Sequence, residues 1–113
     1  MNEAGFGRWV HVCALDDVPW AGGVAVLAEG RALAVFRTGD GGLAAVADRC
    51  RHRFMPIHDG HVYDDVVECT YHGWRFDLRT GDLLTSFGAV RGIACYDARQ
   101  IDGRVEVRIP PLS

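Results

Sequence analysis

The sequence lacks several features that would place it among membrane or nucleic-acid-binding proteins. No stretch of its 113 residues approaches the ~20 consecutive apolar residues that a transmembrane helix needs. The segment from Met1 to Gly7 has neither a basic region nor an apolar run, so we expect no signal peptide. A net charge of −3 argues against nucleic acid or an anionic membrane as the main partner. We therefore expect a cytoplasmic protein that binds neither.

The composition predicts one folded domain over residues 1–113. An apolar fraction of 49% allows a hydrophobic core, and 113 residues provide for a single core. A charged fraction of 24% is that of a globular protein rather than of a disordered chain. Repeats and low-complexity segments are absent from the sequence.

The local pattern predicts an all-β fold. No segment has a sustained helical period, and short runs of β-forming residues alternate with clusters of Gly, Asp and Pro. The architecture that fits is a small antiparallel β sandwich or barrel. The predicted strands cover residues 8–15, 23–28, 31–37, 43–48, 61–63, 66–69, 74–78, 83–84, 95–99 and 104–109.

Two short pairs of residues form the main functional motif, Cys50-x-His52 and Cys69-x-x-His72. Sixteen residues, 53 to 68, separate the pairs. Two thiolates and two imidazoles are a complete ligand set for a metal centre. A structural zinc site also uses this set, but zinc fingers group the two Cys as one pair and the two His as the other. Mixed pairs instead favour a centre whose two metal ions differ in their ligands.

In this spacing the motif resembles that of the Rieske [2Fe–2S] ferredoxin family. The flanking segments 72–77 (His-Gly-Trp-Arg-Phe-Asp) and 80–81 (Thr-Gly) are similar to the family as well. The resemblance implies a Rieske fold, a β core that carries a subdomain of two cluster loops at about 49–58 and 69–76. It also implies one [2Fe–2S] cluster per chain, with one iron held by the two Cys and the other by the two His.

The resemblance implies a one-electron carrier with no independent catalysis. Its partners would be an NAD(P)H-dependent flavoprotein reductase and a terminal oxygenase of the ring-hydroxylating type. An alternative is the small subunit of an NAD(P)H-dependent assimilatory nitrite reductase, to which segments 12–19 and 72–77 are similar. A zinc-stabilised binding module without a redox role is a third class. We do not expect an oxygenase α subunit, because 113 residues leave no room for its mononuclear iron domain.

Other residues near the motif have expected roles of a different kind. The edges of His52 and His72 are the predicted port for electrons, and the residues expected to surround them are Arg51, Arg53, Phe54, Met55, Pro56 and Trp74. His58 and His61 do not fit the ligand spacing, so we expect solvated loop residues. Cys13 and Cys95 are expected to be small buried hydrophobes in strands rather than a disulfide.

Overall fold

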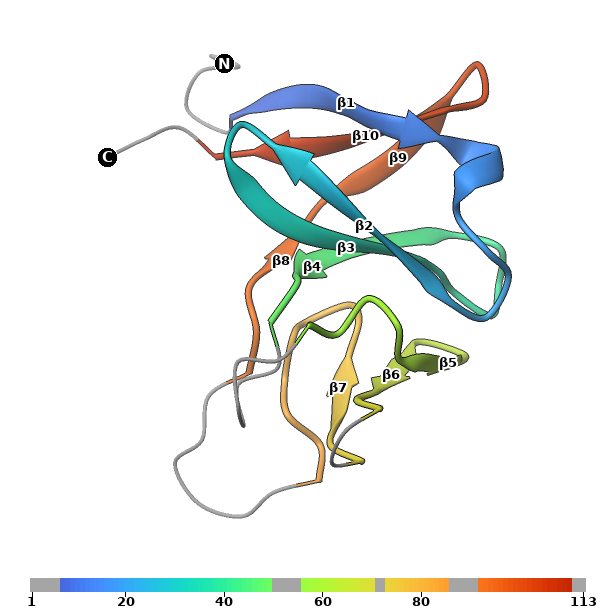
Figure 1. Cartoon of the computed structure of the whole chain (residues 1–113), viewed down its shortest axis with the longest axis vertical. Helices are drawn as coiled ribbons and strands as arrows, with labels where there is room; N and C mark the ends of the chain where they lie inside the picture. The colour runs from blue at the N-terminus through green and yellow to red at the C-terminus, as the bar shows by residue number, and fades with distance from the viewer. Residues whose placement is uncertain (1–6, 50–55, 71–72, 86–91, 111–113) are drawn as a thin grey trace.

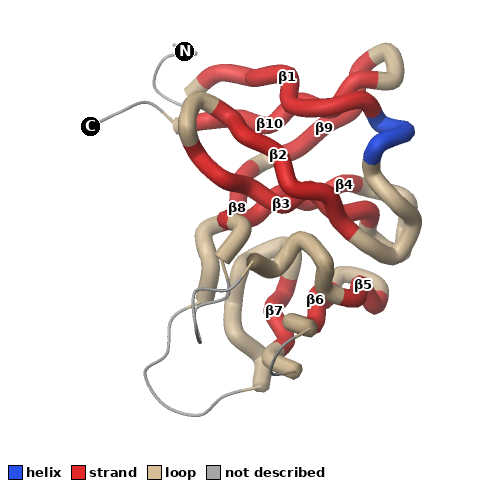
Figure 2. Tube along the Cα trace, viewed as in Figure 1, coloured by secondary structure: helices blue, strands red, loops and turns tan. Residues whose placement is uncertain are grey.

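The computed structural model describes residues 7–49, 56–70, 73–85 and 92–110. Within these ranges the chain forms ten strands in three antiparallel sheets and one 3₁₀ turn, η2 (Leu15–Asp17) (Figures 1 and 2). None of the helical segments in this described part is long and apolar enough to cross a membrane. The predicted all-β fold is confirmed.

The three sheets follow one another in space as layers. Sheet A has the order β1 (Arg8–Ala14), β10 (Arg104–Ile109), β9 (Ala98–Ile101). Sheet B has the order β2 (Gly23–Ala28), β3 (Arg31–Arg37), β4 (Leu43–Ala47), β8 (Cys95–Tyr96). Sheet C has the order β5 (His61–Tyr63), β6 (Val66–Glu68), β7 (Arg75–Asp77). Figure 1 shows sheets A and B together, with sheet C on the far side of sheet B.

Sheet B is a wall with a hydrophobic core on each face. In β3, four consecutive residues, Leu33 to Phe36, are fully or almost fully buried, as expected of a strand that is covered on both faces. Successive side chains point to opposite faces of a strand. Accordingly Leu33 and Val35 pack on one side of the wall, and Ala34 and Phe36 pack on the other.

The two cores lie between different pairs of sheets. The body core, between sheets A and B, consists of Val18, Ala28, Leu33, Val35, Ala45, Val105, Val107 and Ile109. The junction core, between sheet B and the segment that holds sheet C, consists of Ala34, Phe36, Ala44, Val46, Ile57, Val62, Val67, Cys69, Phe76, Leu78 and Ile93. In sheet A, β10 alternates between exposed or half-buried and buried residues, and its buried residues Val105, Val107 and Ile109 face the body core.

The predicted strand over residues 95–99 is wrong as a single element, because the chain changes sheets at Asp97. In β8, Cys95 pairs with Val46 of sheet B. In β9, Ala98 pairs with Val107 of sheet A. The Asp97 carbonyl accepts a hydrogen bond from the Arg108 backbone N–H at 2.9 Å, so this residue joins the two sheets. The local pattern contains no break here, because both pieces are β-forming.

The two cysteines outside the motif contact different cores. Cys13 on β1 packs against the body core, and Cys95 on β8 packs against the junction core. Both thiols are free, as predicted, but each residue is half-buried rather than buried. Burial and then the charge of Asp17 raise the pKa of Cys13. Burial, followed by the charges of Asp77 and Asp82, raises the pKa of Cys95 to about 11.

Candidate metal centre

The second motif pair begins at the tip of the β6–β7 hairpin. The Cys69 N–H donates to the Trp74 carbonyl at 2.7 Å, and the Gly73 N–H donates back to the Cys69 carbonyl at 3.0 Å. These two bonds close a loop whose last turn requires a positive φ, and Gly73 adopts it at 71° without steric cost. The hairpin therefore presents Cys69 at one end of a tight, backbone-closed loop.

Cys69 is almost completely buried, with 1% of its surface exposed. It belongs to the junction core together with Ile57 and Phe76, and Trp74 is half-buried against the same core. The Cys69 sulfur is thus a soft donor at an apolar site, held by a rigid hairpin. Such a position suits a metal ligand whose charge is neutralised by the metal.

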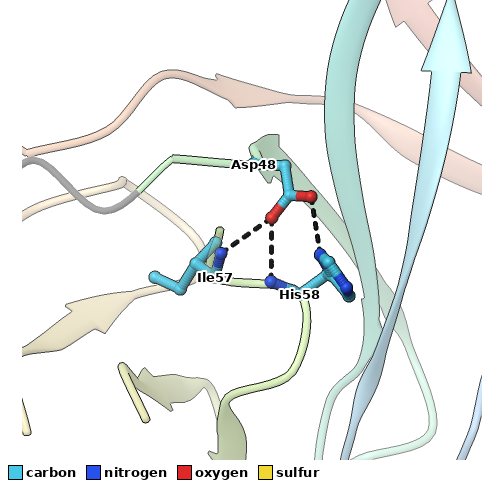
Figure 3. Close-up of polar contacts among 3 residues, drawn as sticks. All are labelled: Asp48, Ile57 and His58. Carbon is cyan, nitrogen blue, oxygen red and sulfur yellow. Dashed lines mark hydrogen bonds and ion pairs between the residues drawn. The ribbon is translucent and has the colours of Figure 1, made fainter. Parts of the chain in front are cut away.

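Asp48 contacts Ile57 and His58 (Figure 3), and the first motif pair lies between Asp48 and Ile57 in the sequence. Asp48 directly follows β4, and one carboxylate oxygen, Oδ1, accepts the backbone N–H groups of Ile57 and His58, both at 2.8 Å. The other oxygen, Oδ2, lies 2.7 Å from Nδ1 of His58. Only 8% of the Asp48 side chain is exposed. A single buried carboxylate therefore connects the two ends of the segment that contains Cys50 and His52.

The bases of the two loops lie against each other. The Thr70 hydroxyl donates to the Asp59 carbonyl at 3.0 Å. A Cβ added at Gly60 would approach the Glu68 carbonyl oxygen to 2.4 Å, so only glycine allows the two backbones to come this close. Residues 57–60 and 68–70 thus form one contiguous platform from which both loops leave.

The structure describes one of the four predicted ligands. Cys69 is placed at the platform, whereas Cys50, His52 and His72 lie outside the described residues. Of the residues predicted to surround the electron port, Pro56 and Trp74 are half-buried. The other four, Arg51, Arg53, Phe54 and Met55, also lie outside the described residues.

The sequence does not reveal the role of Asp48 or its contact with His58. His58 lies in a loop, as predicted, and 35% of its side chain is exposed, but its ring also pairs with Asp48, which the prediction did not include. His61, at the exposed start of β5, is solvated as expected. The one local signal was the tendency of Asp to accept backbone N–H bonds at the end of a strand. Its partners lie nine and ten positions away, beyond any short-range pattern.

Comparison with known proteins places this geometry in a family. Residues 8–97 match the family model of the Rieske [2Fe-2S] domain. The chain is 34% identical to the anthranilate 1,2-dioxygenase ferredoxin subunit of Burkholderia cepacia over 109 residues, which are 96% of this chain and 99% of that subunit. It also matches longer oxygenase proteins, such as the dicamba O-demethylase oxygenase component of Stenotrophomonas maltophilia, of whose length it spans 13%.

Solved structures of similar proteins share the fold. A putative NADH-dependent nitrite reductase small subunit from Mycobacterium tuberculosis superposes with a TM-score of 0.83 at 26% identity, covering 94% of this chain and 98% of that one. A chain in the complex of reduced oxygenase and oxidised ferredoxin in carbazole 1,9a-dioxygenase gives a TM-score of 0.76 at 29% identity, covering 93% and 96%. The mixed Cys/His pairs, the paired loop bases and these matches agree, and the chain belongs to the Rieske [2Fe–2S] domain family.

Proposed function

We propose that this protein is a Rieske-type ferredoxin that carries single electrons to a terminal oxygenase of the ring-hydroxylating type. The observation that carries the proposal is the match to a dioxygenase ferredoxin subunit over 99% of that subunit's length. A match of this extent covers a whole electron-carrying subunit rather than one domain of an oxygenase. Residues 1–113 are accordingly proposed to act as a single Rieske domain.

The proposed cluster ligands are Cys50, His52, Cys69 and His72. The residues that the structure describes fit this assignment, because Cys69 is a buried sulfur at the tip of a closed hairpin. Its loop starts beside the base of the loop that contains Cys50 and His52. Four ligands from two adjacent loops are what a Rieske cluster requires. The cluster loops are proposed at about 49–58 and 69–76.

A Rieske cluster, when bound, supplies one-electron transfer at a site with no open coordination position for a substrate. The residues of this chain then hold the two loops and exclude water from one side of the site. Cys69, Ile57 and Phe76 supply the buried apolar floor. This arrangement supports electron transfer and gives no reason to expect independent catalysis.

The proposed partners are an NAD(P)H-dependent flavoprotein reductase as donor and the oxygenase as acceptor, with no role for nucleic acid or a membrane. The similar chain in the carbazole 1,9a-dioxygenase structure comes from a complex of oxygenase and ferredoxin, which supports the second partner. Because both expected partners are enzymes that use NAD(P)H or its electrons, we propose that the protein acts in the cytoplasm.

A second candidate function is that of the small subunit of an NAD(P)H-dependent nitrite reductase. The observation in its favour is the TM-score of 0.83 to a putative subunit of this kind, over 98% of that chain. At 26% identity this match is weaker in sequence than the 34% match to the ferredoxin subunit. The two functions share one electron-carrying site and differ in the acceptor.

Metal analysis of the purified protein tests the site. We expect two iron atoms and two acid-labile sulfides per chain, a visible absorption that dithionite bleaches, and a paramagnetic signal after reduction. His72→Cys should keep a cluster with a lower potential, because an anionic ligand replaces a neutral one and disfavours the added electron. One zinc ion per chain with no sulfide, after anaerobic reconstitution with iron, would identify a structural zinc site instead.

Electron transfer to purified acceptors tests the choice between the two functions. The reduced protein should be reoxidised by a ring-hydroxylating oxygenase at least tenfold faster than by a nitrite reductase large subunit. The opposite order would favour the nitrite reductase function. The apoprotein, mixed with the same reductase and acceptor, is the control for direct transfer between the two enzymes.

A further inference from the structure

Asp48 links the base of the first loop to sheet B through both its backbone and its carboxylate. The Asp48 N–H donates to the Ala32 carbonyl at 3.0 Å, and the preceding Ala47 N–H donates to the Ala94 carbonyl at 2.9 Å. Ala47 and Asp48 are therefore both fixed by backbone hydrogen bonds before the loop begins. The carboxylate extends from this fixed backbone and accepts the two N–H groups at the far end of the loop.

The far end of the loop is equally well anchored. Ile57 is completely buried in the junction core that also contains Cys69. The Ile57 carbonyl accepts the Gly60 N–H at 2.9 Å, which forms the turn beside the second loop. The Asp48 carboxylate thus joins the wall of sheet B to the platform on which both loops rest. The His58 ring completes this clamp by pairing with Oδ2.

We propose that Asp48 is a positioning residue for the cluster, which fixes the loop of Cys50 and His52 and places a negative charge at its base. The proposal rests on the ligand assignment of the proposed function. Only Arg49 lies between Asp48 and Cys50 in the sequence, so the Cα atoms of Asp48 and Cys50 are at most ~7 Å apart. A buried carboxylate interacts with a nearby charge more strongly than an exposed one does. Because reduction adds negative charge, the carboxylate lowers the reduction potential.

The first experiment separates the charge of Asp48 from its geometry. Asp48→Asn keeps an oxygen that accepts the Ile57 and His58 N–H groups but removes the charge, so the holoprotein should retain its cluster while the potential shifts upward. Asp59→Asn is the matched control, because it removes an exposed charge near the same loop. We expect its shift to be less than half of that in Asp48→Asn. Equal shifts, or none in either variant, would overturn the electrostatic role.

The second experiment tests the clamp through the rate at which a chelator removes iron from the holoprotein. Asp48→Ala leaves two backbone N–H groups without their acceptor, at a cost of at least about 1.4 kcal/mol, so cluster loss should accelerate at least about tenfold. Asp48→Asn should stay within about threefold of the unaltered protein. The paramagnetic spectrum of reduced Asp48→Ala should also change, because it responds to ligand orientation. An unaltered rate and spectrum in Asp48→Ala would overturn the positioning role.

The His58 partner provides a second, milder pair of variants should Asp48→Ala fail to fold. His58→Leu leaves Oδ2 without its partner and should accelerate cluster loss, whereas His58→Asn keeps an amide donor near the same place and should restore the rate. Equal rates in both variants would remove His58 from the clamp and contradict the proposal. Failure of the ligand assignment looks different: His52→Ala would then keep an unaltered cluster spectrum, whatever the Asp48 variants do.

Discussion

The two faces of sheet B are covered by structures of different kinds. On one face, sheet A has strands of four to seven residues and covers the body core of aliphatic side chains. On the other face, the three strands of sheet C have three residues each. Isolated strands this short contribute few ladder hydrogen bonds. The segment around sheet C is instead held by Phe76 and Ile57 in the junction core and by polar clamps such as Asp48. We infer that sheets A and B, the body of the domain, are stabilised by their own strand pairing and core. The segment around sheet C depends instead on the junction core, on polar clamps and on the cluster.

Removal of the cluster should show the difference between the two regions most strongly. After iron is chelated, amide hydrogen exchange in β5, β6 and β7 should accelerate at least about tenfold, because the short strands lose the cluster that ties the two loops together. Exchange in β3 and β10 should change by less than about threefold. Mass spectrometry of peptides from both regions measures this in one sample. Uniform acceleration through all three sheets would show that body and segment are one cooperative unit.

Truncation of one large side chain in each core provides the next test. Phe76→Ala, in the junction core, should lower the free energy of unfolding by about 3–5 kcal/mol and promote cluster loss. Leu33→Ala, in the body core, should cost about 2–5 kcal/mol but leave the visible spectrum of the cluster unaltered below the unfolding transition. Both residues are essentially completely buried, so exposure does not distinguish them. Early cluster loss in Leu33→Ala would contradict the separation of the two cores.

Substitution of two glycines with similar backbone angles tests how closely the chain is packed in the two regions. Gly81 and Gly103 have φ of 83° and 77°. A Cβ at Gly103 would meet nothing within 4 Å, so Gly103→Ala should cost only the ~1–2 kcal/mol of a left-handed alanine. At Gly81 the Cβ would lie 2.0 Å from the Ile93 carbonyl oxygen, so Gly81→Ala should cost at least about 1 kcal/mol more. If both variants lose the same free energy of unfolding in urea, the backbone around Gly81 and Ile93 can move apart without a measurable cost.

An effect that appears only at alkaline pH concerns the pH dependence that Cys95 contributes. Its pKa is raised from the ordinary 9.0 to about 11 in the folded protein. The unfolded chain therefore loses this proton first, so stability is full below about pH 9 and decreases as the pH rises to about 11. Across this range the free energy of unfolding should fall less steeply in Cys95→Ala than in the unaltered protein. Parallel curves would indicate that the folded thiol ionises like a free one.

The body and the segment of sheet C differ in how far the sequence predicts them. Most strands were predicted to within one or two residues, because runs such as 31–37 are rich in β-forming side chains between turn signals. The change of sheets at Asp97 was missed because it depends on which partner strand is adjacent, which a local pattern does not contain. The four proposed ligands follow from a spacing specific to one kind of centre. The Asp48–His58 clamp depends on a contact across a folded loop, so no motif reveals it.

The pairing of β4 with β8 has a consequence for protein engineering. The chain leaves sheet B after Ala47 and returns to it at Cys95, and these two strands are neighbours, with Val46 opposite Cys95. Everything between them is therefore inserted at one point, as if into the tip of a hairpin. A two-residue turn such as Asn-Gly has the geometry to join such antiparallel neighbours directly. The inserted segment is thus a unit for exchange between related scaffolds. Its replacement by a turn would remove the metal centre but would also expose Phe36 and the other residues of sheet B that pack in the junction core.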